Sequence, residues 1–432
     1  MSTRRLAIFQ LFCLLASFWS ALARADNASV NARKHDARTD RLGGLSQAEL
    51  GQLALYLERG PIALVEFADK SEDELPAINL ASYVNAPAAS IAEVVGNPLG
   101  YPEFMRTIDK VSVVQKTGNT TVYDWQWSLA LFRLQGRHAM TVYPPVPGRA
   151  SSGYRITVDS ISGDLGAGRF SLRLIPLSRD RTLAVLSIRM DMRTANYVVR
   201  QMAKATRSVN RSANIALAAS TLLSLRRQAE RKAGFRPANE VSEQFGRPPV
   251  DIRTLSPLLA RGDLVMLDMI GDRLGQITVV GRVDYEVGLV RKVMTDTEAF
   301  GSALVPGSYV KVVSRQADGT EFEWGVDLPL VGVEGRMKLT NTGSVVAVDA
   351  VQGALSGGKW RFEASELAKN ATLVVGWTRF DLRNSTWLLK SLVDIDPFLG
   401  HGFSAAADIM LIRALRSRVG KLIAGNAPAG KN

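Results

Sequence analysis

Cysteine is nearly absent from this 432-residue chain, which contains only Cys13. Cys13 lies in an apolar N-terminal run, so the rest of the chain has no disulfide, no thiol nucleophile and no thiolate ligand for a metal. A protein of this size without cross-links depends on apolar cores for its stability, and its length suffices for two domains.

Histidine is also scarce, with His35, His138 and His401 as its three examples. They share no spacing typical of metal ligands, so we predict neither a metal site nor a cofactor. No Gly-x-Ser-x-Gly motif supports a nucleophilic serine, although a Ser-His-Asp triad needs no proximity in sequence and stays open. No basic run interleaved with aromatic residues is present, so we predict no nucleic-acid partner.

The N-terminus has the pattern of a secretory signal. Arg4 and Arg5 precede an apolar core, and a small-x-small cleavage site ends at Ala25, so we expect removal of residues 1–25. An uncleaved membrane anchor is the alternative, but the apolar core is shorter than the roughly 20 residues that span a bilayer. We therefore expect a periplasmic or secreted protein whose polar residues 26–45 form a flexible leader.

The formal net charge of the chain is +12. Lipid headgroups are the polyanions that an exported protein meets, so weak attraction to an anionic membrane surface is one interpretation of this charge. A solvated basic surface without a partner is the other interpretation, which we favour.

A tandem repeat organises the rest of the sequence. An offset of 199 aligns residues 112–140 with 311–339, and an offset of 190 continues the match after nine extra residues in the first copy. The segments 58–67 and 260–269 also match. Matched pairs include Trp125 and Trp324, Gly136 and Gly335, Arg137 and Arg336, and Asp191 and Asp381.

The duplication predicts a domain plan. It consists of a first domain over 46–234, a proline-containing linker over 235–251, a second domain over 252–425 and a tail over 426–432.

Alternation of apolar and polar residues predicts strands in each copy. Over 122–132, the side chains of Tyr123, Trp125 and Trp127 share one strand face, and polar residues occupy the other. Half-buried strands of this kind are typical of an antiparallel sheet with one face in water. Matching or further strands are expected at Phe322, Trp324 and Val326, and over 155–162, 169–176 and 182–192.

Helical periodicity predicts the end of the first copy. Residues 194–234 have an apolar stripe from Val198 to Leu223 and a basic stripe that includes Arg200, so we expect one long amphipathic helix. Shorter helices are expected over 90–104 and 287–300.

Residues 83–114 resemble the opening of START-like (helix-grip) domains of the polyketide cyclase and coenzyme-Q-binding type. Ala86-Pro87 ends a strand, and Asn97 with Tyr101-Pro102-Glu103-Phe104 matches the next family motif. The second copy departs from both motifs, with Asp284-Tyr285 and Phe300-Gly301-Ser302-Ala303 at those places.

The resemblance implies an α+β protein of tandem helix-grip domains. Each would be a curved antiparallel sheet wrapped around a long C-terminal helix, with an apolar cavity between them. The resemblance also implies a lipid, quinone, sterol or polyketide-like ligand, and a minority of such proteins catalyse reactions in the cavity.

Five residues are candidate ligand contacts. Trp125, Trp127 and Trp324 are expected to face the interior, where core and cavity wall coincide. Arg137 and Arg336 would orient a carboxylate or carbonyl if buried in the cavity. On the surface they would be merely solvated, which we favour.

The sequence predicts no catalytic residue. Asp191 and Asp381 are the best acid or base candidates, but the residues after each lead into a helix, so we favour a capping role.

Gly163, Gly166 and Gly168 in ISGDLGAGRF (161–170) resemble a phosphate-binding loop. A strand rather than a helix follows them, and VQGALSGGKWRF (351–362) repeats the pattern. We therefore predict a tight bend between strands, where positive φ favours glycine.

Three functional hypotheses follow. We favour an exported binding or carrier protein for a hydrophobic molecule. The alternatives are a cyclase, hydrolase or isomerase that acts on a lipid-like substrate, and an interaction module that docks its basic helix face on a membrane or a partner.

Overall fold

The computed structural model describes residues 44–67, 77–129, 132–148, 152–197, 200, 207–236, 245–298, 308–328 and 331–426. The predicted signal segment, most of the expected leader, the middle of the expected linker and the tail beyond Asn426 lie outside these residues. Leu45, at the end of the expected leader, is only 1% exposed and belongs to an apolar cluster with Leu53.

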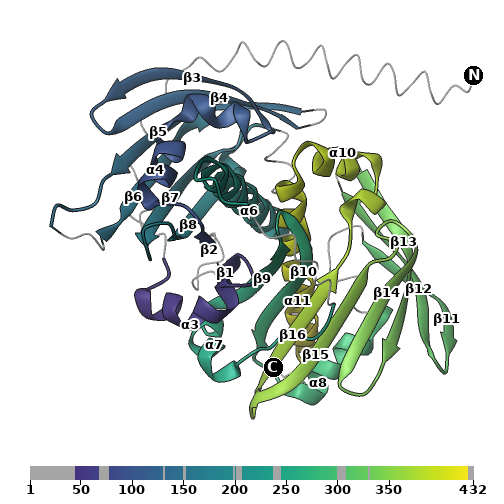
Figure 1. Ribbon diagram of the computed structural model, residues 1–432. Coiled ribbons are helices and arrows are strands. Elements are labelled where there is room, and N and C mark those ends of the chain that lie inside the picture. The colour runs from purple at the N-terminus through teal and green to yellow at the C-terminus, as the bar shows by residue number, and fades with distance from the viewer. Residues whose placement is uncertain are drawn as a thin grey trace, which may run out of the picture. The chain divides into compact units, whose positions relative to one another are not determined.

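The two copies contain the same series of elements, where η denotes a 3-10 helix (Figure 1). The first copy consists of α3 (Gln47–Leu57), β1 (Ile62–Glu66), β2 (Ile78–Val84), α4 (Ala88–Gly96), η1 (Pro98–Glu103), β3 (Ile108–Thr117), β4 (Thr120–Leu129), β5 (Phe132–Tyr143), β6 (Tyr154–Gly163), β7 (Ala167–Pro176), β8 (Thr182–Asp191), η3 (Met192–Thr194) and α6 (Arg207–Lys232). The second consists of α7 (Ile252–Leu259), β9 (Gly262–Ile270), β10 (Arg273–Val283), α8 (Val287–Thr295), β11 (Tyr309–Gln316), β12 (Gly319–Leu328), β13 (Val331–Asn341), β14 (Val345–Gly353), β15 (Lys359–Ala368), β16 (Ala371–Arg379), η4 (Leu382–Asn384), α10 (Trp387–Ile395) and α11 (Pro397–Asn426).

The repeated series confirms the tandem copies. Apart from η1 in the first copy and α10 in the second, each described element has a counterpart, in the order that the START-like resemblance implies. The described residues from Gly44 to Asn426 belong to one compact unit, so the domain boundaries proposed within it stay predictions.

All described strands join one antiparallel sheet, in the order β11-β12-β13-β14-β15-β16-β10-β9-β1-β2-β8-β7-β6-β5-β4-β3. Strands near the junction of the copies, such as β8 and β16, are buried at nearly every position. The reason is that helices cover both faces there, with α3 and α7 on one side and α4, α6, α8 and α11 on the other. The expectation of one wet face is therefore wrong for the central strands and holds for the outer ones.

The copies meet with pseudo-twofold symmetry at β1 and β9. These strands pair antiparallel with Ala63 opposite Val265, which are matched positions of the repeat. Equivalent residues thus face each other, as they do at the interface of a symmetric dimer.

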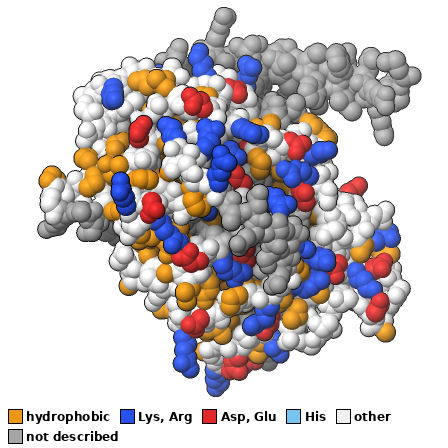
Figure 2. Space-filling model, viewed as in Figure 1, with side chains coloured by type: hydrophobic (Ala, Val, Ile, Leu, Met, Phe, Trp, Pro, Cys, Tyr) orange, Lys and Arg blue, Asp and Glu red, His pale blue; other side chains and the backbone are white. Residues whose placement is uncertain are grey.

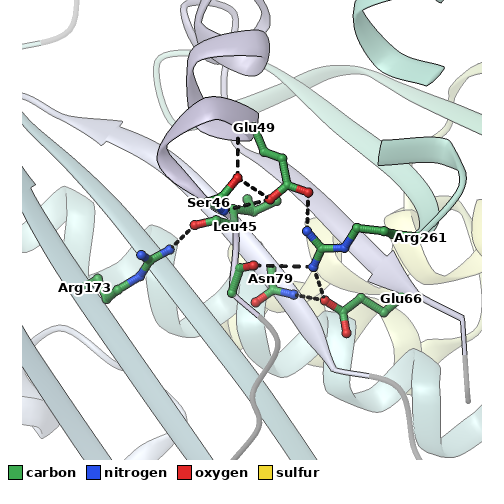
Figure 3. A network of polar contacts seen from close by, with 8 residues as sticks. Leu45, Ser46, Glu49, Glu66, Asn79, Arg173 and Arg261 are labelled. Atoms are coloured by element: carbon green, nitrogen blue, oxygen red, sulfur yellow. Dashed lines mark hydrogen bonds and ion pairs between the residues drawn. The ribbon is translucent and has the colours of Figure 1, made fainter. Parts of the chain in front are cut away.

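Two ion pairs follow the same symmetry. Arg59 lies 2.5 Å from Asp268, and its counterpart Arg261 lies 2.7 Å from Glu66, the counterpart of Asp268. Arg261 also contacts Glu49, whose carboxylate completes a capping box with Ser46 at the start of α3 (Figure 3). The Arg261 guanidinium therefore joins α3 and β1 of the first copy to the start of β9 in the second.

The long helices α6 and α11 also join the copies. A side chain at Gly402 would lie 2.4 Å from the Cα of Ala216, so only glycine permits this approach. Ser220 donates a hydrogen bond to Asp396 at 2.6 Å. By length and composition α11 could cross a membrane, but 67% of its most apolar window is buried within the fold.

The helix expected over 194–234 is confirmed as α6 over Arg207–Lys232, and η3 precedes it. Its amphipathic character is not confirmed, because residues 214–219 and 222–225 are buried without interruption. The packing of α11 against α6 explains this burial. Most side chains of the expected basic stripe lie outside the described residues.

Other boundaries differ locally from expectation. The helix over 90–104 divides into α4 and η1 at Asn97, because Pro98 disfavours helical geometry in the residue before it. The helix expected over 287–300 ends at Thr295. The single strand expected over 122–132 is two strands, since β4 ends at Leu129 and β5 begins at Phe132.

Candidate functional site

The second copy contains an apolar cavity of about 240 Å³. Alternation along β12 turns Phe322, Trp324 and Val326 into it, and the neighbouring strand β13 contributes Met337 and Leu339. The same face continues on β14, β15 and β16, so one side of the sheet forms most of the wall.

Helix α11 forms much of the opposite wall. Ala407, Met410, Leu411 and Leu415 recur at helical spacing and line the cavity. The long C-terminal helix and the strand face, two patterns visible in the sequence, therefore enclose the site.

A tryptophan and two glycines from adjacent strands shape the sheet side of the cavity. Trp324 on β12 lies opposite Gly335 on β13, which lies opposite Gly353 on β14. A Cβ at Gly335 would lie 3.2 Å from Nε1 of the Trp324 indole and 2.7 Å from the carbonyl oxygen of Gln352. The missing side chain of Gly335 thus leaves room for the indole ring, and that of Gly353 lets β14 approach Gly335 closely.

The first copy repeats this arrangement, with Trp125, Gly136 and Gly163 in the same register. A Cβ at Gly136 would lie 2.6 Å from the Trp125 ring, and one at Gly163 would lie 2.5 Å from the Cα of Gly136. Tryptophan packing therefore explains the matched glycines Gly136 and Gly335, and close backbone approach explains Gly163 and Gly353, neither of which the sequence revealed.

The matching interior of the first copy is occupied by ring side chains. Tyr123, Trp127 and His138 stand where the second copy has Phe322, Val326 and Met337 of the cavity wall. His138 lies with its ring centroid 5.3 Å from that of Trp125 and 5.7 Å from that of Tyr123. Burial lowers the pKa of His138 to about 4, so the ring is neutral at pH 7.

The predicted tryptophans lie on the inner face of the sheet. Trp125 and Trp324 are buried, and Trp127 is half-buried with its ring centroid 5.5 Å from that of Trp125. Of the three, Trp324 lines the cavity of the second copy. Whether any of them contacts a ligand stays a prediction.

The two predicted arginines lie elsewhere. Arg137 pairs with Asp124 at 2.6 Å, and Arg336 pairs with Glu323 at 3.1 Å, on the strand face opposite to the tryptophans. The Arg137 and Asp124 side chains are 44% and 42% exposed. The structure therefore does not bring either arginine to the cavity, and the solvated alternative describes them better.

The two aspartates are capping residues, as predicted, but contrary to expectation they do not cap the start of the long helices. Asp191 and Asp381 accept hydrogen bonds from the backbone N–H of Arg193 and Arg383, at 3.0 and 2.9 Å. Each caps a 3-10 turn, η3 or η4, rather than the long helix itself.

His138 and His401 lie in different copies, on β5 and α11, and His35 lies outside the described residues. His401 lies within α11 rather than before it, with Nε2 3.0 Å from the carbonyl oxygen of Asp272. Within the described ranges, no cluster of three or more His, Cys, Asp or Glu side chains could hold a metal ion.

The ISGDLGAGRF stretch forms the bend between β6 and β7, as predicted. Gly163 and Gly166 have φ of 136° and 89°, and Gly353 in the matching bend has φ of 81°. Leu355, with φ of 65°, turns its side chain into the cavity wall.

One buried acid lies next to the cavity and had no signal in the sequence. Asp408 of α11 is 0% exposed and accepts a hydrogen bond from Thr378 of β16. Burial raises the pKa of Asp408 to about 8, so its carboxyl is mostly protonated at pH 7. Cavity-lining residues flank it on the helix, at Ala407 and Ile412.

No protein-family model matches the chain, and no curated protein matches it. Among solved structures, it is similar to the Zhui aromatase/cyclase from Streptomyces sp. R1128, with 21% identity over 38% of this chain and 98% of that chain and a TM-score of 0.29. The di-domain ARO/CYC StfQ from the steffimycin biosynthetic pathway is similar over 80% of this chain and 99% of that chain, with 10% identity and a TM-score of 0.27.

A STAR-related lipid transfer protein (fragment 25–204) from Xanthomonas axonopodis is similar over 39% of this chain and 93% of that chain, with 14% identity and a TM-score of 0.30. TM-scores this low transfer no function to the chain. Its function is therefore inferred from the cavity.

Proposed function

We propose that the protein binds and carries a hydrophobic small molecule in the cavity of its second copy. The observation that carries this proposal is the wall, in which every described side chain except Thr297 is aliphatic, aromatic or a methionine. The volume of about 240 Å³ exceeds the roughly 150 Å³ of an engineered apolar cavity that binds benzene. A molecule with two fused rings, or one end of a lipid, is therefore a suitable ligand.

The proposed origin of the cavity is helix-grip wrapping. Open sheets of more than roughly ten strands tend to curl because of their twist, and the described part of this sheet has sixteen. We propose that the second copy's part of the sheet curves around α11, which contacts β9, β10 and β16. The space between the strand face and the helix is then the binding site.

Binding is favoured over catalysis because no described residue of the wall is titratable, as a general acid or base must be. Asp408 adjoins the wall residue Ala407 along α11 but is not itself a lining residue, and one of its carboxyl oxygens accepts a hydrogen bond from Thr378. The interaction-module hypothesis assumes that the protein's own side chains fill the cavities. It suits the first copy, whose matching interior contains ring side chains, better than the second.

Export and membrane contact belong to the same proposal. Removal of residues 1–25 would place the carrier in a periplasm or outside the cell. On the face shown in Figure 2, Lys and Arg side chains are interspersed with Asp and Glu rather than gathered in a continuous patch. This distribution supports a solvated surface over strong electrostatic docking on that face.

A cavity-filling variant tests the proposed function. Val326→Trp introduces into β12 the side chain that the first copy has at the matched position, Trp127. Because β4 of the first copy holds a tryptophan at this position, we expect β12 to accommodate one. We expect this variant to bind a naphthalene probe at least about tenfold more weakly than the wild type, because the ring occupies ligand space. Fluorescence titration of the mature protein measures the affinity.

The matched control is Trp127→Val in the first copy, which should leave probe affinity within about threefold of wild type. Thermal unfolding of both variants verifies that each is folded. Unchanged affinity in a folded Val326→Trp protein would exclude this cavity as the site.

A further inference from the structure

A second hollow, of about 180 Å³, lies where β10 begins and β16 ends, and we call it the basic hollow. Its lining consists of Ile270, Arg273, Leu274, Gly275 and Arg379. None of these residues lines the apolar cavity. Thr378, the residue before Arg379, bonds to Asp408 of α11, so alternation along β16 turns the Arg379 side chain to the opposite face of the sheet.

A row of charged residues crosses three strands beside the basic hollow. Asp349 on β14 lies opposite Lys359 on β15, which lies opposite Arg379 on β16. The guanidinium of Arg379 lies over the ring of Phe245, 5.4 Å from its centroid. Among the described residues, neither Lys359 nor Arg379 forms an ion pair with an acidic side chain.

The first copy has the matching row and uses its charges differently. There Asp159 pairs with Arg169, the counterpart of Lys359, at 2.5 Å. In the second copy Asp349 pairs instead with Arg361 at 2.9 Å, and the first copy has Ser171 in place of Arg361. The second copy therefore has one more cation on this face for the same acid.

The other acids nearest to the hollow along β9 and the β9–β10 turn also have basic partners. Asp268 lies 2.5 Å from Arg59, and Asp272 lies 4.0 Å from Arg227. The positive charge at the hollow is thus not neutralised by these acids, and an anion there would gain from it.

We propose that the basic hollow binds the phosphate of a monoester through the guanidinium groups of Arg273 and Arg379, with Lys359 as a neighbouring cation. The planar fork of arginine suits phosphate oxygens, and several cations suit a group that carries about −1.5 to −2 charges at pH 7. A lipid such as phosphatidic acid and a free phosphate monoester present the same oxygens. The site is separate from the apolar cavity and does not depend on the proposed function.

Two probes represent the two sources of this phosphate. Glycerol 3-phosphate is titrated into the mature protein by calorimetry at pH 7.5 and low salt, with acetate as the comparison anion. Vesicles with phosphatidic acid are tested by co-sedimentation against vesicles of equal charge made with phosphatidylglycerol, a diester. We expect saturable binding of the monoester, with acetate at least about tenfold weaker because it has one charge and fewer acceptor oxygens.

Arg379→Gln should weaken monoester binding at least about tenfold, since charged hydrogen bonds are lost. Arg379→Lys keeps the charge without the fork and should recover only part of the affinity. The matched control is Arg315→Gln, which removes an exposed arginine from β11 and should leave affinity within about twofold of wild type. Thermal unfolding verifies that each variant is folded.

The source of the phosphate follows from the two arms. A lipid ligand predicts preferential sedimentation with phosphatidic acid vesicles, which Arg379→Gln reduces and glycerol 3-phosphate competes away. A free ligand predicts binding of glycerol 3-phosphate without that preference. Absence of saturable binding in both arms, or unchanged binding in folded Arg379→Gln protein, would overturn the proposed site and leave the apolar cavity untouched.

Discussion

His138 is one of the residues by which the matched interiors of the two copies differ. His138 lies among Tyr123, Trp125 and Phe170 in the first copy, whereas Met337 lines the cavity at the same place in the second. Among the described residues the enclosed Nε2 of His138 has no hydrogen-bond partner, and Nδ1 lies 3.4 Å from the Tyr123 hydroxyl, so protonation inside the fold would bury a charge without a counter-ion.

This burial predicts loss of stability in acid. The folded-state pKa of His138 is about 4, below its ordinary value of 6.5, so the unfolded chain binds the proton first as pH falls. Stability is fully present above pH 6.5 and decreases towards pH 4, by about 3 kcal/mol for this group.

His138→Met introduces the residue of the second copy and should remove that part of the pH dependence. Urea unfolding of wild type and variant at pH 7.5 and 4.5 measures it. The same loss between these pH values in both proteins would show that His138 is not responsible.

At the scale of elements, the tryptophan and two glycines across β12, β13 and β14 form one packing unit. Gly335→Ala should destabilise the protein by about 1–3 kcal/mol, because the added Cβ meets the backbone carbonyl oxygen of Gln352 at 2.7 Å. Nε1 of the Trp324 indole lies 3.2 Å from the added Cβ, so this wall residue must move and the affinity for the naphthalene probe should also decrease. Denaturant unfolding and the probe titration measure the two effects.

Gly51→Ala is the control for a change from glycine to alanine without crowding. No atom lies within 4 Å of a Cβ at this position in α3, so stability should rise by about 0.5–1 kcal/mol from helix propensity. A Gly335→Ala protein as stable as the wild type would refute the packing role of this glycine.

At the scale of the whole molecule, the continuous sheet and the paired helices make the copies interdependent. We expect the described fold to unfold in a single transition despite its length. Arg261→Met should shift that whole transition, since it leaves the half-buried carboxylates of Glu49 and Glu66 without their shared cation, at a cost of about 2 kcal/mol.

Calorimetry combined with tryptophan fluorescence measures this transition. Arg315→Met removes an exposed pair with Glu298 and should cost less than about 0.5 kcal/mol. Two separate transitions, of which Arg261→Met shifts only one, would mean that the copies are independent domains.

Much of the fold could be predicted because its signals are local. The alternation in β4, the turn glycine Gly163 and the helix after Asp191 follow from short-range geometry, and the repeat showed them twice. The candidate site was predicted only in part. Trp324 lies in the wall, but Arg336 faces away, because a one-residue step along a strand reverses the side chain's direction.

The sequence by itself determined the duplication, the α+β character and the order of elements, since these depend on periodicity and matched positions. Only the tertiary structure decided that one continuous sheet joins the copies, that a cavity lies in the second copy, and that Asp408 is buried beside it. The physical reason is that these features depend on contacts between residues far apart in sequence. Whether an interior is filled or open depends on side-chain volumes meeting in space, as His138 and Met337 illustrate.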